Sequence, residues 1–268
     1  MKLFKHKLSV IMPAYNEGHH IYENIKETHR VLRRARCGYE VILVDDGSRD
    51  NTYEEARRAA AELGCTVPVS VPENRGKGNA LKEGFNHASG DFVIFLDADL
   101  DLHPEQLHRV LRVMRDERAD VIVGSKYNPD SRLEYPFSRK VMSKVYALVL
   151  KVLFDLPLRD TQTGLKAFRK EVLEKVFPLV HTSGFAFDIE LLSNAHGLGY
   201  RVVEAPVVID NRREMKWGRI TMKDMYRMWL DTMAIYYRQY MRRANFASAD
   251  KGGRKKVKNA GKYGELSR

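Results

Sequence analysis

Three carboxylates follow an apolar run near the middle of the chain. Residues 92–96 are all apolar, which is typical of a buried central strand, and Asp97, Asp99 and Asp101 come directly after them. If this segment stays extended, the period of two puts the three carboxylates on one face. Buried carboxylates repel one another unless a cation compensates, and such oxygen ligands suit Mg²⁺ or Mn²⁺ shared with substrate phosphates. The sequence therefore predicts a divalent-metal site, and the alternative is a solvated acidic loop that caps the helix near Pro104.

The first half of the chain alternates predicted strands and helices. Strands are expected at 8–12, 40–44, 67–71, 91–96 and 120–124, and helices at 21–34, 53–63, 79–88 and 104–115. This alternation predicts an α/β fold with a largely parallel sheet and helices on both faces. Ligands of such sheets gather at the carboxyl ends of the strands. Three strands end there in polar clusters, 13–17, 45–48 and 97–101, so we expect the site at that edge.

The second half is less regular. We expect helices at 138–154 and 186–196, a polar loop at 159–164 and a strand at 201–209. The predicted organisation is a catalytic domain over 1–220, an amphipathic helix over 221–243 and a basic, disordered tail over 244–268.

Composition limits the class of protein. The chain has 268 residues, 44% of them apolar, and two cysteines, which excludes a disordered chain and a disulfide scaffold. Cys37 and Cys65 have no second Cys or His at metal-binding spacing, which favours a reducing, cytosolic setting. Residues 211–268 hold 16 of the 46 Lys and Arg residues but only 5 of the 35 acidic residues, and so carry the whole net charge of +11. Residues 1–210 are near neutral, so binding of nucleic acid by the main body is not supported.

The expected location is the cytosolic face of a membrane, as a cytoplasmic protein bound peripherally. The N-terminus is basic but lacks the apolar run of a signal peptide, and no stretch approaches the roughly 20 uncharged residues of a membrane span. The helix at 221–243 alternates Met and aromatic residues with Lys and Arg, as interfacial helices do. We therefore expect docking through this helix and the tail, and the alternative is a helix packed on the main domain.

Two polar clusters at strand ends each allow more than one interpretation of their role. Asp45 and Asp46 precede Gly-Ser, so they either initiate a turn or accept hydrogen bonds from the base and ribose of a nucleotide. Tyr15 and Glu17, which leave the first strand, offer an aromatic face and a carboxylate in the same way.

Basic residues suggest phosphate contacts. Lys77 lies in a glycine-containing turn that opens a helix and suits an anion, although the spacing is not that of a P-loop, and the alternative is a solvated lysine. Arg139 and Ser143 are four residues apart on one helix face and suit a phosphate, or are an ordinary exposed pair. Arg212 and Arg213 are a second candidate phosphate clamp.

Taken in order, the motifs resemble glycosyltransferase family 2, and this resemblance implies a GT-A fold, a nucleotide-sugar donor and a divalent metal. The motifs that carry it are 10–17, 44–48, 74–78 and 97–99. Segments 160–168 and 187–192 further resemble dolichyl- and polyprenyl-phosphate glucosyl- and mannosyltransferases, and the resemblance covers about residues 8–235.

The resemblance also implies roles for individual residues. The nucleotide-sugar would contact Pro13, Tyr15, Glu17, Asp45 or Asp46, Lys77, Asp97, Ala98, Lys126, and Arg212 or Arg213. The metal, Mg²⁺ or Mn²⁺, would be held by Asp97, Asp99 and Asp101. Lys126 stands where many relatives have Arg, so a bidentate phosphate contact becomes a point charge.

The acceptor side of the site is implied in the same way. Arg139 and Ser143 match positions that hold the acceptor phosphate. Asp188 or Asp160 would serve as a general base, or would instead orient Lys166 or an arginine. A lipid monophosphate is largely dianionic at neutral pH, so its attack needs positioning more than a base.

The expected function is inverting transfer of a hexose, glucose or mannose, from UDP-glucose or GDP-mannose to a polyprenyl or dolichyl phosphate. One alternative is a family 2 transferase with a soluble or polysaccharide acceptor. A second alternative, from another class, is a non-catalytic membrane module that binds a nucleotide-sugar. The complete set of acidic residues argues against a dead site.

Overall fold

The computed structural model describes residues 6–35, 37–125, 148–156, 158–184, 186–208 and 228–241. The chain divides into two units, Met1–Thr221 and Met222–Arg268. In the second unit, residues 228–241 are helical, and the Tyr236 and Tyr240 rings stack one turn apart with centroids separated by 6.4 Å. None of the helices in the described ranges is long and apolar enough to cross a lipid bilayer.

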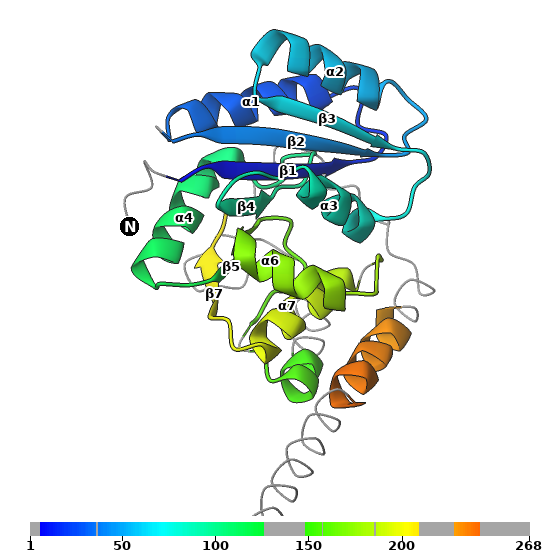
Figure 1. The fold of residues 1–268 in the computed structure, drawn as a ribbon, viewed down its shortest axis with the longest axis vertical. Coiled ribbons are helices and arrows are strands. Elements are labelled where there is room, and N and C mark those ends of the chain that lie inside the picture. The colour runs from blue at the N-terminus through cyan, green and yellow to red at the C-terminus, as the bar shows by residue number, and fades with distance from the viewer. Residues whose placement is uncertain are drawn as a thin grey trace, which may run out of the picture. The chain divides into compact units, whose positions relative to one another are not determined.

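The described part of the first unit contains a seven-stranded sheet in the order β3-β2-β1-β4-β6-β5-β7 (Figure 1). The strands are β1 (Leu8–Ala14), β2 (Tyr39–Asp46), β3 (Thr66–Val71), β4 (Phe92–Phe95), β5 (Val121–Ser125), β6 (Lys166–Arg169) and β7 (Val202–Pro206). Neighbouring strands run parallel except β6, which is antiparallel to both β4 and β5. The predicted α/β class with a mainly parallel sheet is confirmed.

Helices connect most of these strands. They are α1 (Ile21–Arg33), α2 (Thr52–Leu63), α3 (Lys77–Asn86), α4 (Leu107–Asp116), α6 (Lys170–Val176) and α7 (Phe187–Gly197), with short 3-10 helices η2 (Pro104–Gln106) and η3 (Phe177–Leu179). Residues 148–154 are also helical, and the earlier part of the helix predicted at 138–154 lies outside the described residues.

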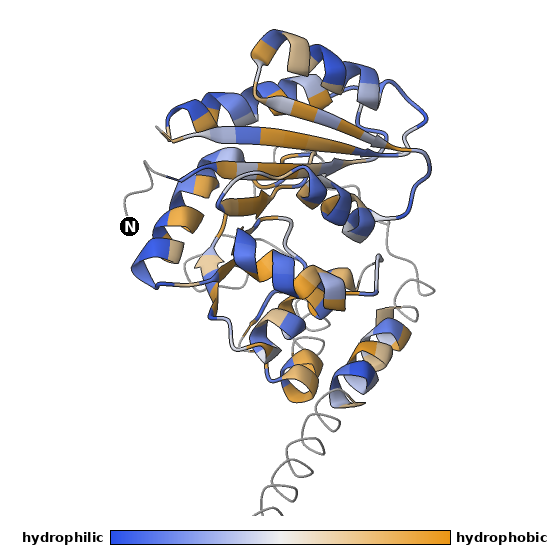
Figure 2. Cartoon of the chain, viewed as in Figure 1, coloured by the Kyte–Doolittle hydropathy of each residue, from blue (hydrophilic) through white to orange (hydrophobic). Residues whose placement is uncertain are grey.

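The sheet is covered on both faces. In α4, Leu107, Val110, Leu111 and Met114 follow the helical period and are buried, and they share one apolar cluster with residues of α1, α2 and the strands. The opposite face meets α3, where Gly84 lies so close to the sheet that a Cβ would be 2.4 Å from Ile11. Figure 2 shows the consequence, with hydrophobic strands at the centre and hydrophilic outer surfaces on α1 and α2.

The register of the parallel strands places the carboxyl ends of β1, β2 and β4 at one edge of the sheet, where the ligand is expected. In β1 and β2, Ala14 pairs with Asp45, so both strands end at the same level. β4 pairs with β1 up to the Ile11–Phe95 pair, so the segment after β4 leaves the sheet at that same edge. The convergence of the three strand ends is therefore a property of the parallel register.

Two elements were not predicted from the sequence. β6 is four residues long and begins with Lys166, whose side chain is buried although lysine is rarely found inside a protein. Helix α6 begins directly after β6. Its N-cap residue is Arg169, which makes no side-chain cap, so the sequence has no typical helix-start residue at this point. The strand predicted at 201–209 is shorter, since β7 ends where its partner β5 ends, at the Ser125–Pro206 pair.

Candidate active site

The loops that follow β1 and β2 lock into one another. The Asn16 amide nitrogen donates to Ser48 Oγ at 2.8 Å, and Asn16 Oδ1 accepts from the Arg49 amide at 2.9 Å. One residue on, the Glu17 amide donates to Thr52 Oγ1 at 2.9 Å. Asn16 has a φ of +55°, a conformation that Asn tolerates better than most residues. The two loops thus form one rigid rim, from which Tyr15 projects with 42% of its surface exposed.

Asp45 and Asp46 are both buried and both shape turns. Asp45 accepts from the Ser48 amide at 3.1 Å, which closes its own turn. Asp46 accepts from the Arg75 amide at 3.0 Å and the Gly76 amide at 2.9 Å, so it holds the loop that leads into α3. The turn-forming reading of this pair is therefore correct, while a contact to the nucleoside stays a prediction.

That loop delivers Lys77 to the segment after β4. Lys77 Nζ forms an ion pair with Asp97 Oδ1, and each side chain is 37% exposed. Burial lowers the pKa of the Lys77 ammonium, but the charges of Asp97, Asp188 and Asp99 raise it by more, so its pKa is raised overall. Lys77 is therefore paired with Asp97 while more than a third of its side chain stays exposed, and its contact to a phosphate stays a prediction.

The segment after β4 is not extended, contrary to the expectation from the sequence. Asp97 O accepts from the Leu100 amide at 3.2 Å, and Leu100 has a φ of +54°, so residues 97–100 form a tight turn. The Asp101 amide then donates to Asp99 Oδ1 at 3.2 Å. The turn breaks the period of two, so the extended conformation on which a shared face of Asp97, Asp99 and Asp101 depended is not present.

The turn nevertheless crowds negative charge. The pKa of Asp99 is raised to about 6, first by burial and then by the charges of Asp97 and Asp101. In the described part of the chain, no three His, Cys, Asp or Glu side chains are grouped so as to hold a metal ion. Crowded carboxylate oxygens of this kind fit a divalent cation that takes its other ligands from substrate phosphates. The metal assignment to Asp97, Asp99 and Asp101 stays a prediction.

A second loop packs against Asp97 from the far half of the chain. A Cβ on Gly164 would lie 1.9 Å from Asp97 Oδ2, so only glycine allows this approach. The loop is shaped by Asp160, which accepts from Thr163 Oγ1 at 2.5 Å and from the Gln162 amide at 3.1 Å. The Asp160 amide in turn donates to Glu204 Oε1 at 3.0 Å. The Asp160 carboxylate is thus engaged in building its own loop.

Asp188 extends the charged centre into the core. Its Oδ1 lies 2.8 Å from Lys166 Nζ, and the Lys166 side chain is only 2% exposed. Lys166 Nζ also donates to Thr163 O at 2.5 Å, in the loop that carries Gly164. Asp97 pairs with Lys77 and Asp188 pairs with Lys166, and the charge of Asp188 also raises the pKa of Lys77. The predicted alternative that Asp188 orients Lys166 matches this geometry, and its role as a base stays a prediction.

The sequence model of the family described as Glycosyl transferase family 2 matches residues 9–177. The chain belongs to glycosyl transferase family 2. Among curated relatives, it is 35% identical over 210 residues to Dolichol-phosphate mannosyltransferase of Pyrococcus furiosus, which covers 75% of this chain and 55% of the relative. It is 33% identical over 203 residues to Glycosyltransferase AglD of Haloferax volcanii, which covers 75% of this chain and 32% of the relative. The chain thus spans about half or less of the length of these relatives.

A solved structure gives the fold of this family 2 member. Glucosyl-3-phosphoglycerate synthase from Mycobacterium tuberculosis, in complex with Mn²⁺, uridine-diphosphate and phosphoglyceric acid, superposes with a TM-score of 0.64 at 22% identity. The alignment covers 86% of this chain and 77% of that one. The predicted GT-A fold is confirmed, as is the resemblance to the dolichyl-phosphate branch of family 2.

Glu190 holds a loop next to Lys77, a role that was not predicted from the sequence. It is 2% exposed, and its Oε2 accepts from the His181 and Thr182 amides at 2.9 and 2.8 Å. The next carbonyl, Ser183 O, accepts from the Gly78 amide at 3.1 Å, beside Lys77. An acid within an otherwise apolar helix was the available signal, because a buried carboxylate needs donors.

The remaining predicted site residues divide into two groups. Pro13 lies in β1 beyond the last pair with β4, and Ala98 is buried within the 97–100 turn. The others lie outside the described residues, so their roles stay predictions: Lys126, Arg139, Ser143, Arg212 and Arg213.

Proposed function

We propose that this family 2 glycosyltransferase moves a hexose from a nucleotide-sugar to a polyprenyl or dolichyl phosphate with inversion at the anomeric carbon. The observation that carries the proposal is the charged centre of Asp97, Asp99 and Lys77 at the carboxyl edge of the sheet. The lipid phosphate is supported by 35% identity to a relative named for dolichol phosphate, and a nucleoside diphosphate donor by the UDP in the structural neighbour.

The donor would lie across the rim formed by the β1 and β2 loops. Tyr15 offers an exposed ring for the base. Glu17 and Asp45 are the predicted partners of its polar groups, although Asp45 is buried and already accepts from the Ser48 amide. Lys77 would face the diphosphate, because its ammonium is held charged at the edge of the rim. UDP-glucose and GDP-mannose are the two donors to be tested.

Asp97 and Asp99, with Asp101 as the predicted third ligand, would hold Mg²⁺ or Mn²⁺. The ion would neutralise the charge that develops on the departing diphosphate. The structural neighbour contains Mn²⁺, which supports this assignment. Within the protein, the Lys77 ammonium pairs with Asp97 and limits the repulsion when no cation is present.

The chemical step follows from charge. An acceptor phosphate oxygen forms a bond to the anomeric carbon while the bond to the nucleoside diphosphate breaks, and the diphosphate leaves with the electron pair. Because a phosphate monoester has a second pKa of about 6, it is largely a dianion at neutral pH and can attack without a strong base. Arg139 and Ser143 are the predicted acceptor-binding pair, and Asp188 is engaged with Lys166.

The test is a radiolabelled sugar-transfer assay with purified protein and a polyprenyl phosphate in detergent. UDP-glucose and GDP-mannose are compared with Mn²⁺, with Mg²⁺ and with EDTA. Label that moves into the organic phase and disappears with EDTA is the expected result, and it names the donor. Donor binding without lipid labelling would contradict the lipid acceptor and favour a soluble or polysaccharide acceptor.

We also propose that the C-terminal segment docks on a membrane surface. Its support is the +11 charge of residues 211–268 and the aromatic helix at 228–241, where Tyr236 stacks on Tyr240. Flotation with liposomes containing anionic lipid should show binding that weakens when 242–268 is deleted. Unchanged binding would contradict this role of the tail.

A further inference from the structure

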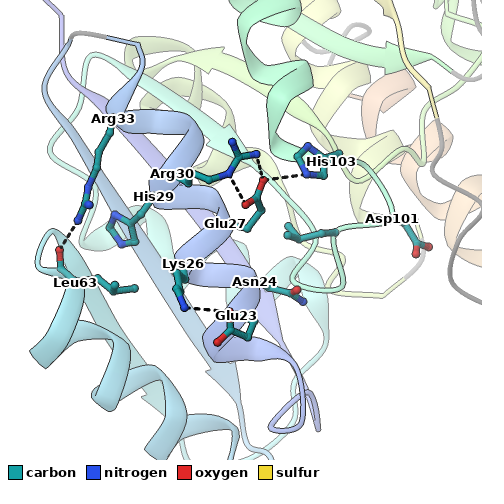
Figure 3. A pocket seen from close by; sticks show the side chains of 11 residues that line it. Glu23, Asn24, Lys26, Glu27, His29, Arg30, Arg33, Leu63, Asp101 and His103 are labelled. Atoms are coloured by element: carbon teal, nitrogen blue, oxygen red, sulfur yellow. Dashed lines mark hydrogen bonds and ion pairs between the residues drawn. The ribbon is translucent and has the colours of Figure 1, made fainter.

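Helix α1 contacts the 97–100 turn and the residues that follow it (Figure 3). Asn24 and Glu27, one helical turn apart, face the segment that follows β4. Asn24 Nδ2 donates to Ala98 O at 2.7 Å, and Glu27 Oε1 lies 3.0 Å from His103 Nε2. Both residues line a cavity of about 680 Å³ that Leu100 also lines. The turn is therefore bonded to α1 through Ala98, while its Asp97 side chain pairs with Lys77 of α3.

Asn24 is an unusual residue for its position. It is 4% exposed and lies in the buried stripe of α1, among Ile21, Ile25 and Thr28. Asn has a modest helix propensity, and a buried amide is costly unless it is hydrogen-bonded. An apolar residue would serve packing better at this position. The polar side chain is therefore explained by its bond to Ala98 and not by the stability of the helix.

The hydrogen bond from Asn24 to the Ala98 carbonyl acts on the backbone between the two carboxylates of the turn, Asp97 and Asp99. The Ala98 carbonyl lies in the peptide plane that joins Ala98 to Asp99, so holding it orients the backbone that carries the Asp99 side chain and that follows Asp97. Leu100 has a φ of +54°, a conformation that persists only where neighbouring contacts hold it. Helix α1 itself starts from the rim in which the Glu17 amide is bound to Thr52, so the support is rigid.

We propose that Asn24 is a positioning residue for the divalent cation, acting through the Ala98 carbonyl to hold Asp97 and Asp99 in a ligating arrangement. This inference rests on the proposed metal-dependent function. Residues that orient metal ligands typically change metal affinity by about 10–100-fold when they are replaced. We expect Asn24→Leu, which keeps the branched shape of the side chain and loses the donor, to raise the dissociation constant for Mn²⁺ by about tenfold or more.

The control variant is Thr28→Val. Thr28 lies one turn further along α1, is fully buried, and donates to Asn24 O at 2.8 Å, so its hydroxyl bonds within the helix and not to the turn. Mn²⁺ binding is measured by calorimetry on the full chain with saturating UDP or GDP present, because the cation is expected to take ligands from the diphosphate, and thermal unfolding is measured in EDTA. We expect both variants to lower the melting temperature, and only Asn24→Leu to weaken Mn²⁺ binding. Asn24→Ala, which also lacks the donor, replaces Asn24→Leu if the larger side chain prevents folding.

Three results would overturn the inference. If Mn²⁺ binds wild type and Asn24→Leu equally, Asn24 does not position the ligands, and the proposed function is unaffected. If Thr28→Val weakens Mn²⁺ binding as much as Asn24→Leu does, the effect is general destabilisation of α1. If wild type binds no Mn²⁺, the metal part of the proposed function fails together with the inference.

Discussion

Replacing Asp99 with Asn is expected to stabilise the metal-free protein at neutral pH while removing its metal-dependent activity. Asp99 is crowded by Asp97 and Asp101, and its pKa is raised from 3.8 to about 6. Ionised Asp99 therefore opposes folding above pH 6. The amide of Asn has no charge, and its Oδ1 can still accept from the Asp101 amide as Asp99 Oδ1 does.

The size of the effect follows from the pKa shift. Each pKa unit corresponds to about 1.4 kcal/mol, so the shift sets an upper limit of about 3 kcal/mol. Partial exposure of the carboxylate to solvent reduces this to about 1–2 kcal/mol. For a domain of this size, such a gain raises the melting temperature by about 2–6 °C.

The raised pKa also predicts how the stability difference between wild type and Asp99→Asn changes with pH. Because folding raises the pKa of Asp99, the stabilising contribution of its protonated form is complete below about pH 4 and is lost as the pH rises through about 6. Asp99→Asn keeps that contribution at every pH. The stability difference between the variants should therefore grow between pH 4 and pH 6 and stay constant above it.

The assay is thermal or urea unfolding of both proteins in EDTA across pH 4–8, repeated with Mn²⁺. Wild type should gain stability from Mn²⁺ and Asp99→Asn should not, because binding to the folded state is what stabilises it. A variant that is less stable than wild type at pH 7.5 in EDTA would refute the account of a crowded carboxylate. A difference that does not change with pH would refute it as well.

Further predictions concern the groups around this turn. Gly164→Ala should lower metal-dependent transfer at least about tenfold with little loss of stability, because the new methyl would displace the Asp97 carboxylate, whereas Gly184→Ala should be silent because nothing lies within 4 Å of its Cβ position. Equal activity in the two glycine variants, measured at saturating Mn²⁺, would contradict the contact. Asp188→Asn should destabilise the protein by about 3 kcal/mol or more, since it leaves the buried Lys166 without its carboxylate, and Lys166→Met combined with Asp188→Leu should recover most of that loss in urea unfolding. A stable Asp188→Asn variant that had lost only the acidic, low-pH limb of its pH–rate profile would instead identify a general base.

The sequence predicted the parts of the fold that follow from periodicity. Alternating apolar strands and amphipathic helices were sufficient for the parallel sheet and for the edge at which β1, β2 and β4 end. β6 escaped because its burial depends on a tertiary ion pair: Lys166 enters the core only because Asp188, on α7, neutralises it. The residues next to Lys166 in the sequence do not indicate that Asp188 will be its partner.

The site was predicted in its residue types and only partly in its geometry. The acidic cluster at Asp97–Asp101 was recognised, but the turn that shapes it was not, because Leu100 adopts a positive φ that is rare for leucine. The close approach of Gly164 to Asp97 joins residues from different halves of the chain, so it required the fold itself.

The most direct test of the central claim is a titration of Mn²⁺ followed by electron paramagnetic resonance, with UDP or GDP present. The account predicts that wild type binds one Mn²⁺ per chain together with the nucleoside diphosphate, and that Asp99→Asn loses this binding while remaining folded. Equal Mn²⁺ binding by the two proteins would contradict the claim that the Asp97–Asp99 turn is the metal and diphosphate centre.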